Sequence, residues 1–338
     1  MAPLATATPM APPAWRRRTV LGQLLALGAG TLPFAARAQG SYPDRPVHMV
    51  IPFTPGGGTD VVGRVLAQAM TPALGQTIVV ENKAGAAGAI GGKAVSSAAP
   101  DGYTLLFTSL GPLTIIPNLP GATLGFDPLK DLTPIELVAR QPVLIVVNKR
   151  LGVQNMDQLL ALARQRQVSY GSPGNGTELH LIGETLRQVT GGQFLHVPYR
   201  GGGPAITDLV GGVIDMLVVV TSSIMPFIKS GDAIPLATTD PARVATLPDV
   251  PTTAEVGLKA VAGTAQWGLL GPAGLPAGVV DTVSKAAVKA MADPVFQQRM
   301  KDSGVVVTPK SAPGFTETLK ADSVMWRGVI TRGGIKAN

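Results

Sequence analysis

A glycine-rich loop between an apolar run and a helical pattern constrains this chain most. Residues 47–53 are almost entirely apolar, as in a buried strand, and Thr54-Pro55-Gly56-Gly57-Gly58 follows. Thr59 and Asp60 then have the character of helix-start residues before the helical pattern of 61–70. Such an element leaves unpaired N–H groups at the positive end of a helix dipole, which favours a small anion. The alternative is a tight turn that needs glycine only for its φ/ψ freedom.

Residues 1–38 have the pattern of an export signal. Arginines 16, 17 and 18 precede a stretch rich in Leu, Ala, Val and Gly, and Ala36-Arg37-Ala38 is an A-x-A cleavage site. The sequence predicts cleavage after Ala38 and a periplasmic mature chain. The paired arginines also resemble a twin-arginine signal, so the export route stays open. A membrane anchor is less favoured, because glycines and a proline interrupt a run that is short for a bilayer.

Composition argues against several classes of function. Removing the four arginines of residues 1–38 lowers the formal charge from +7 to +3, and no basic cluster with interleaved aromatic residues remains, so nucleic-acid binding is not expected. The chain has no cysteine, which excludes thiolate metal sites and cysteine nucleophiles. Its three histidines, at 48, 180 and 196, lack metal-ligand spacing. We therefore expect neither a metal nor a cofactor.

Short apolar runs alternate with helical patterns along the mature chain, which predicts an α/β architecture with largely parallel sheets. The predicted strands are 47–53, 77–81, 103–108, 134–139, 143–148, 168–170, 195–197, 216–221, 234–238 and 266–270. The predicted helices include 91–99, 156–166, 178–189, 204–211, 279–292 and 315–332.

So many strands fit one sheet only awkwardly, so we expect two lobes. Lobe 1 would comprise residues 39–139 and 252–338, and lobe 2 residues 140–251, with crossings near Arg140-Gln141-Pro142 and Pro251. Ligands of α/β sheets bind beyond the carboxyl ends of the strands, which here places the ligand in the cleft between the lobes.

A second loop of the same kind follows the predicted strand 168–170. In Gly171-Ser172-Pro173-Gly174-Asn175-Gly176-Thr177, Thr177 is a plausible N-cap and His180 falls three residues later. One such loop in each lobe would grip a ligand from both sides. Turn geometry alone, with His180 as a structural hydrogen-bonding residue, is the alternative.

Two further segments offer polar groups to the predicted cleft. Tyr199 and Arg200 precede Gly201-Gly202-Gly203, and Ser109 follows the predicted strand 103–108. A solvent-facing loop with an exposed arginine is the alternative for the first segment. Catalysis is disfavoured, since Ser172, His180 and Asp215 have no sequence reason to meet and the spacing of a nucleophile elbow is absent.

Taken together, these segments resemble the Bug-type solute receptors, the extracytoplasmic binding subunits of tripartite tricarboxylate transporters. The stretches that carry the resemblance are YPDRP at 42–46 leading into PFTPGGGTD at 52–60, APDGYTL at 99–105, GNGT at 174–177 with His180, HVPY at 196–199 with Gly201 and 212–215, and LPDVPT at 247–252. The resemblance covers residues 42–335, essentially the whole mature chain.

The resemblance implies a type II periplasmic binding protein fold of two lobes with two inter-lobe crossings. It also implies that residues 53–59 and 172–177 hold a carboxylate, that the lobes close on it, and that a membrane transporter is a transient partner; we expect a monomer. With the residues argued above, the candidate ligand-binding residues are Phe53, Thr54, Gly57, Gly58, Thr59, Ser109, Ser172, Asn175, Gly176, Thr177, His180, Tyr199, Gly201 and Val219.

Val219 bears on the ligand. Receptors of this family that take amino acids are expected to have an Asp at this position to pair with the ammonium group. Burying an ammonium against Val219 would cost several kcal/mol, so the sequence predicts a di- or tricarboxylate or an amine-free monocarboxylate. The same site would serve a receptor read by a signalling kinase, which the sequence does not separate from transport. A periplasmic hydrolase and a purely structural exported protein are less favoured.

Overall fold

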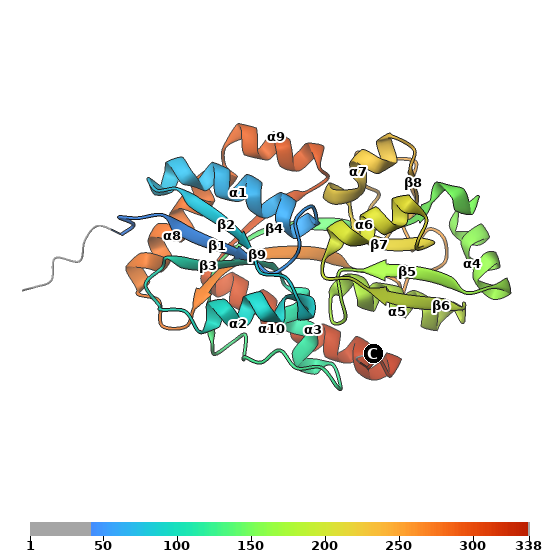
Figure 1. Cartoon of the computed structure of the whole chain (residues 1–338), viewed down its shortest axis with the longest axis horizontal. Coiled ribbons are helices and arrows are strands. Elements are labelled where there is room, and N and C mark those ends of the chain that lie inside the picture. The colour runs from blue at the N-terminus through green and yellow to red at the C-terminus, as the bar shows by residue number, and fades with distance from the viewer. Residues whose placement is uncertain (1–41, 337–338) are drawn as a thin grey trace, which may run out of the picture. The chain divides into compact units, whose positions relative to one another are not determined.

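The computed structural model describes residues 42–336 of the chain, a mixed arrangement of helices and strands (Figure 1). The predicted export signal lies outside the described residues. No helix within residues 42–336 is long and apolar enough to cross a membrane.

One group of strands, here called lobe 1, contains the first predicted loop. β1 (Val47–Ile51) lies between β2 (Ile78–Asn82) and β3 (Thr104–Ser109) and is parallel to both. Its apolar run is the reason, because a strand covered on both faces must be apolar at nearly every position, and Val47, Met49, Val50 and Ile51 are all fully buried. α1 (Gly58–Leu74) and α2 (Ala89–Ser96) follow β1 and β2 in the chain.

A second group of strands, here called lobe 2, repeats this pattern. β5 (Val168–Ser172) pairs in parallel with β6 (Phe194–Pro198) and β7 (Met216–Val220), and β8 (Ala233–Thr238) pairs with β4. The helices of lobe 2 are α4 (Met156–Gln165), α5 (Glu178–Thr190), α6 (Gly202–Gly211) and α7 (Thr221–Lys229).

The two groups are joined by β4 (Leu132–Asn148) and β9 (Thr264–Pro272), which lie at the centre of Figure 1. Residues 132–142 of β4 pair with β9, and residues 143–147 pair with β7. The prediction of two separate strands, 134–139 and 143–148, was therefore wrong. Arg140, Gln141 and Pro142 stay in the ladder opposite Gln266, Ala265 and Thr264, because β9 supplies a partner that the local sequence does not reveal.

The prediction of largely parallel sheets was also wrong at the centre of the molecule. Every pairing of β4 and β9, including that with β10 (Val306–Ser311), is antiparallel. One of these segments leaves lobe 1 and the other returns to it, so the two run in opposite directions. The exact lobe boundaries at 139/140 and 251/252 remain predictions.

The C-terminal helices pack on lobe 1. α1 contacts α8 (Ala277–Met291) and α9 (Pro294–Asp302), and α10 (Ala312–Gly333) contacts β4 and the short helix α3 (Gly111–Ile115). Within residues 42–336 there are also three single 3-10 turns: η1 (Ala86–Gly88), η2 (Ile116–Asn118) and η3 (Lys149–Leu151).

Candidate functional site

A small cavity lies where the loops of lobe 1 meet those of lobe 2. Its volume is about 30 Å³, space for one or two water molecules. A molecule the size of an organic acid is larger than this space. The lining residues are Phe53, Gly57, Gly58, Thr59, Ser109, Pro173, Thr177, Glu178, Leu179, Gly202, Val219, Val220, Ser223, Ala265 and Trp267.

Glycines let the two lobes touch beside this cavity. A Cβ atom added to Gly57 would lie 3.1 Å from the backbone nitrogen of Gly202, and one added to Gly58 would overlap the side chain of Val220. Larger side chains at these two positions would hold the lobes apart. The glycine-rich sequence of the first loop is therefore required by close approach across the cleft as well as by the turn.

The first predicted loop ends in a helix N-terminus without a side-chain cap. The N-cap of α1 is Gly57, so the helix begins at Gly58, before the predicted start residues Thr59 and Asp60. Asp60 instead accepts a hydrogen bond from the backbone N–H of Gly56 at 3.0 Å, which closes the loop on itself. The unpaired N–H groups of this first turn are suited to an anion.

Thr59 adds a hydroxyl to this end of the cavity. Its Oγ1 accepts a hydrogen bond from Trp267 Nε1 at 3.0 Å. Because the oxygen is already an acceptor for the indole, its own hydrogen is free to be donated elsewhere. Trp267 lies in β9, so a strand at the junction of the lobes orients the Thr59 hydroxyl at the N-terminus of α1.

The second predicted loop ends in a capped helix. Thr177 is the N-cap of α5, as predicted: its Oγ1 accepts a hydrogen bond from the His180 N–H at 3.2 Å and donates to the Gly174 carbonyl at 2.8 Å. This hydroxyl is thus fully used within the loop. The capped end differs from that of α1, where no side chain competes with a ligand for the first N–H groups.

Ser172 and His180 lie behind this loop rather than on the cavity wall. Ser172 Oγ is 2.7 Å from His196 Nε2, and the ring of His196 stacks on that of His180 with a centroid distance of 4.3 Å. His180 Nδ1 accepts a hydrogen bond from the Gly176 N–H. Burial lowers the pKa of His180 to about 4 and that of His196 to about 3, so both rings are neutral at pH 7.

The other predicted residues divide between the cavity wall and its surroundings. Phe53, Gly57, Gly58, Thr59, Ser109, Thr177 and Val219 line the cavity. Thr54 packs against the backbone of Gly201, and the Tyr199 hydroxyl donates to Asp208 at 2.6 Å. These two pairs, with Ser172, Asn175, Gly176 and His180, lie outside the lining. Contact of any of them with a ligand remains a prediction.

Glu178 is a lining residue that the sequence did not indicate. It is the first residue of α5, is 3% exposed, and its Oε2 has no hydrogen-bond partner. Burial, and then the nearby Asp322 carboxyl, raise the pKa of Glu178 to about 7. An acid in the first turn of a helix usually complements the helix dipole, so its sequence position gave no sign that it faces a cavity.

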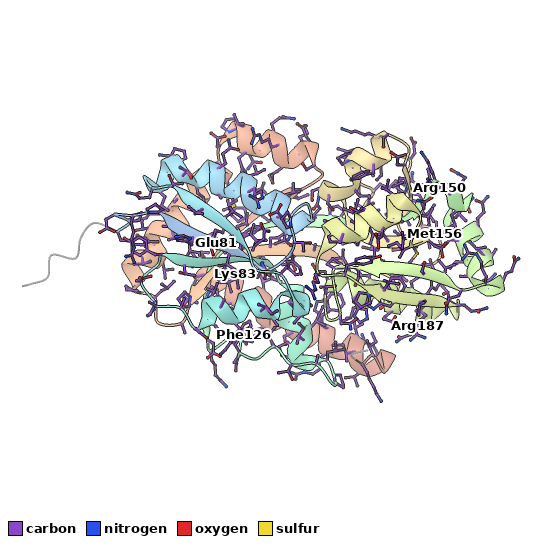
Figure 2. The ribbon with its side chains drawn as sticks, viewed as in Figure 1. Glu81, Lys83, Phe126, Arg150, Met156 and Arg187 are labelled. Atoms are coloured by element: carbon purple, nitrogen blue, oxygen red, sulfur yellow. The ribbon has the colours of Figure 1, made fainter. Side chains whose placement is uncertain are left out.

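The basic side chains of lobe 2 do not line the cavity. Arg150 and Arg187, labelled in Figure 2, are two of these, and Arg187 forms an ion pair with Glu184 at 2.9 Å. Among the residues that line the cavity there is no Lys, Arg or His. A bound anion would therefore be held by N–H and O–H groups alone.

Comparison with known proteins identifies the class. The tripartite tricarboxylate transporter family receptor pattern matches residues 62–335. The chain therefore belongs to this family of Bug-type receptors, which are binding proteins and not enzymes. It is 32% identical to protein BugT of Bordetella pertussis over 95% of this chain and 98% of BugT. It is 37% identical to a UPF0065 protein of Agrobacterium vitis over 83% of this chain and 81% of that protein.

Solved structures confirm the predicted two-lobed periplasmic binding protein fold. The periplasmic binding protein BugD is similar with a TM-score of 0.85 and 36% identity, over 88% of this chain and all (100%) of that one. A Rhodopseudomonas palustris protein solved with adipate has a TM-score of 0.84 and 29% identity, over 88% and 100% of the two chains. MatC of the same organism, solved with malate, has a TM-score of 0.81 and 28% identity, over 86% and 100%.

Proposed function

We propose that this protein binds a small organic acid without an amine and delivers it to a membrane transporter of the tripartite tricarboxylate type. The ligand class is a dicarboxylate, a tricarboxylate or an amine-free monocarboxylate. The observation that carries the proposal is the cavity between the uncapped N-terminus of α1 and the start of α5. Its polar groups are those that favour an anion in the absence of basic side chains.

Two relatives support this ligand class. The structures solved with adipate and with malate share the fold of this chain, and both ligands are dicarboxylates without an amine. Val219 gives independent support, since it is 2% exposed, lines the cavity and offers no charge to an ammonium group. The cost of burying an unpaired ammonium there would be several kcal/mol.

Binding is proposed to proceed by closure of the lobes in the periplasm, after cleavage of the export signal at Ala38. The cavity is too small for an acid when Gly57 meets Gly202, so the ligand enters an open form. Closure then requires that the ligand bind the closed form more tightly than the open one. The transporter would recognise that closed form.

The test is a thermal-shift and calorimetric screen of the purified protein, refolded to remove any carried-over acid. The panel contains adipate, malate, citrate, benzoate, aspartate, glutamate and glucose. An acid at about 100 times its dissociation constant should add roughly 2.7 kcal/mol of stability. We expect shifts with amine-free carboxylates only; tightest binding to aspartate or glutamate would contradict the ligand class, and no shift with any acid would contradict the function.

A matched pair of alanine variants tests the site. In Gly58→Ala the new methyl group overlaps Val220 and obstructs closure, so binding of the active acid should weaken by about 100-fold or more, equivalent to about 2.7 kcal/mol. In Gly278→Ala the methyl group meets no atom within 4 Å in the first turn of α8, so binding should be unchanged. Equal affinities in the two variants would contradict the proposed site.

A further inference from the structure

Glu178 is the one ionisable side chain in the cavity lining. It lies at the contact between lobes, since the Ser109 hydroxyl hydrogen-bonds its carboxyl group and a Cβ added to Gly111 would overlap Oε2. Ser109 and Gly111 belong to lobe 1 and Glu178 to lobe 2, so this contact forms as the lobes close. A carboxyl group in a cavity suited to an anion needs an explanation.

Burial and the nearby Asp322 carboxyl oppose the ionised form of Glu178 and outweigh two hydrogen bonds that favour it, from the Ser109 hydroxyl and from its own backbone N–H. Asp322 of α10 is close enough to raise the pKa of Glu178, and His180, which lies in α5 with Glu178, is buried and neutral. Asp60 of α1 is paired with Arg64 at 2.9 Å. Neither β9 nor the segment from Ser109 to α3 contributes a charged side chain to the lining. An ionised Glu178 would therefore be buried without a counter-charge, which is costly.

One oxygen of the Glu178 carboxyl group has no hydrogen-bond partner. Oε2 is buried, has no hydrogen-bond partner and belongs to a residue that lines the cavity. A protonated carboxyl group carries one O–H donor, and a ligand carboxylate is an acceptor only. A short hydrogen bond from a neutral acid to a carboxylate is among the stronger kinds, because one partner is charged.

We propose that Glu178 is a specificity-determining residue which, as a neutral acid, donates its hydrogen to a carboxylate of the ligand, so that binding above neutral pH takes up one proton from solvent. This inference rests on the proposed function and refines its ligand class. The ligand remains an anion throughout, and the proton stays on Glu178. Lobe 1 supplies the Thr59 hydroxyl and the N–H groups of α1, and lobe 2 supplies the acid.

The opposite arrangement would be an ionised Glu178 paired with the ammonium group of an amino acid. Burial without a cation and the nearby Asp322 both oppose ionisation, so the structure favours the neutral acid. The two arrangements differ in what Glu178→Gln does. A glutamine side chain keeps a donor for a carboxylate but has no charge for an ammonium group.

The experiment measures binding of adipate, malate and aspartate by titration calorimetry between pH 7 and 8.5, above the pKa of about 6 to which burial raises the Asp322 carboxyl. For the wild type we expect the affinity for the amine-free acids to fall by about tenfold per pH unit above the pKa of Glu178. The heat should differ between phosphate and Tris buffers, because one proton is taken up. Glu178→Gln should bind with an affinity that does not change with pH and a heat that does not change with buffer.

The control is Glu317→Gln, an exposed acid of α10, which should behave as the wild type. Binding by the wild type without pH dependence would overturn the inference while leaving the proposed function intact. Aspartate bound by the wild type but lost in Glu178→Gln would also overturn it, in favour of the ammonium pair.

A second measurement tests the protonation state of Glu178 without any ligand. Carboxyl resonances of protein labelled with ¹³C at the glutamate carboxyl carbon are followed as pH is varied, in the wild type and in Glu178→Gln. The resonance missing from the variant identifies Glu178. Titration near pH 7 supports the neutral acid, whereas titration near the ordinary value of about 4.3 contradicts it.

Discussion

The two helix ends at the cavity are alike in sequence pattern and different in chemistry. α1 begins after Gly57 with no side-chain cap, whereas α5 begins after Thr177, whose hydroxyl is bonded at both its donor and acceptor sides. The α1 end therefore keeps its N–H groups for a ligand. At the α5 end the Thr177 cap takes up the His180 N–H, and the cavity also receives the Glu178 carboxyl group.

A glycine-rich strand–loop–helix element therefore does not define a binding site by itself. What matters is whether the N–H groups of the first turn are already bonded. In lobe 2 a supporting layer of Ser172, His180 and His196 also holds the loop from behind. These contacts support the α5 end, whereas the α1 end has no side-chain cap that competes with a ligand.

The largest expected effect is a loss of stability at acid pH, caused by the buried His180 and His196 behind α5. The folded pKa values of His180 and His196 are about 4 and about 3, below the unfolded value of about 6.5. The unfolded chain therefore takes up protons first, so stability is complete above pH 6.5 and is lost as pH falls toward 3–4, by on the order of a few kcal/mol. Melting temperatures recorded between pH 7.5 and pH 4 measure this loss of stability.

His180→Gln keeps an acceptor for Gly176 but cannot be protonated, so it is the matched variant. It should be less stable than the wild type at pH 7.5, and the gap should narrow as pH falls. A gap that is the same at every pH would show that the histidine layer does not make the α5 end acid-sensitive.

Glu178→Gln should have the opposite pH dependence. The folded pKa of Glu178, about 7, is above its unfolded value, so the stability it contributes is present below about pH 4.3 and is lost as pH rises through 7. The variant should therefore be more stable than the wild type by on the order of 1–3 kcal/mol at pH 8, and only slightly more stable at pH 4.5. Urea unfolding at the two pH values measures this, and a variant that gains nothing at pH 8 would contradict a buried acid.

A smaller effect is expected from the cap of α5. Thr177→Ala removes the acceptor for the His180 N–H and should cost about 1 kcal/mol of stability. Asn155→Ala removes an equivalent cap from α4, far from the lining, and should cost about as much. Only Thr177→Ala should also weaken ligand binding. If neither or both variants changed the affinity, the role of the Thr177 cap in shaping the cavity would be contradicted.

Much of the fold was predictable because burial patterns are local. The apolar run of β1, the glycine turn after it and the Thr177 cap all depend on residues within a few positions of one another. β10 was missed because it contains Pro309, is partly exposed and lies at the edge of the sheet, where patterns are weak. α9 was missed although Asp293, followed by Pro294, is a recognisable helix start.

The site was less predictable because it depends on contacts between distant segments. Glu178 faces the cavity because Ser109 and Gly111 meet it from the other lobe. Trp267 orients Thr59 from a strand about two hundred residues later in the chain, as their sequence separation of 208 shows. Neither relation leaves a signal in the local sequence, and the same is true of the β9 segment that keeps Arg140 to Pro142 within β4.

The central claim is that the α1 end, rather than the α5 end, supplies the N–H groups that bind the ligand. The most direct measurement is a ¹⁵N amide spectrum of the protein titrated with the amine-free acid that shifts its melting temperature most. The largest downfield amide shifts are expected at Gly58 and Thr59, with smaller changes at Glu178 and Leu179. Large shifts at Glu178 and Leu179 with unmoved Gly58 and Thr59 amides would contradict it.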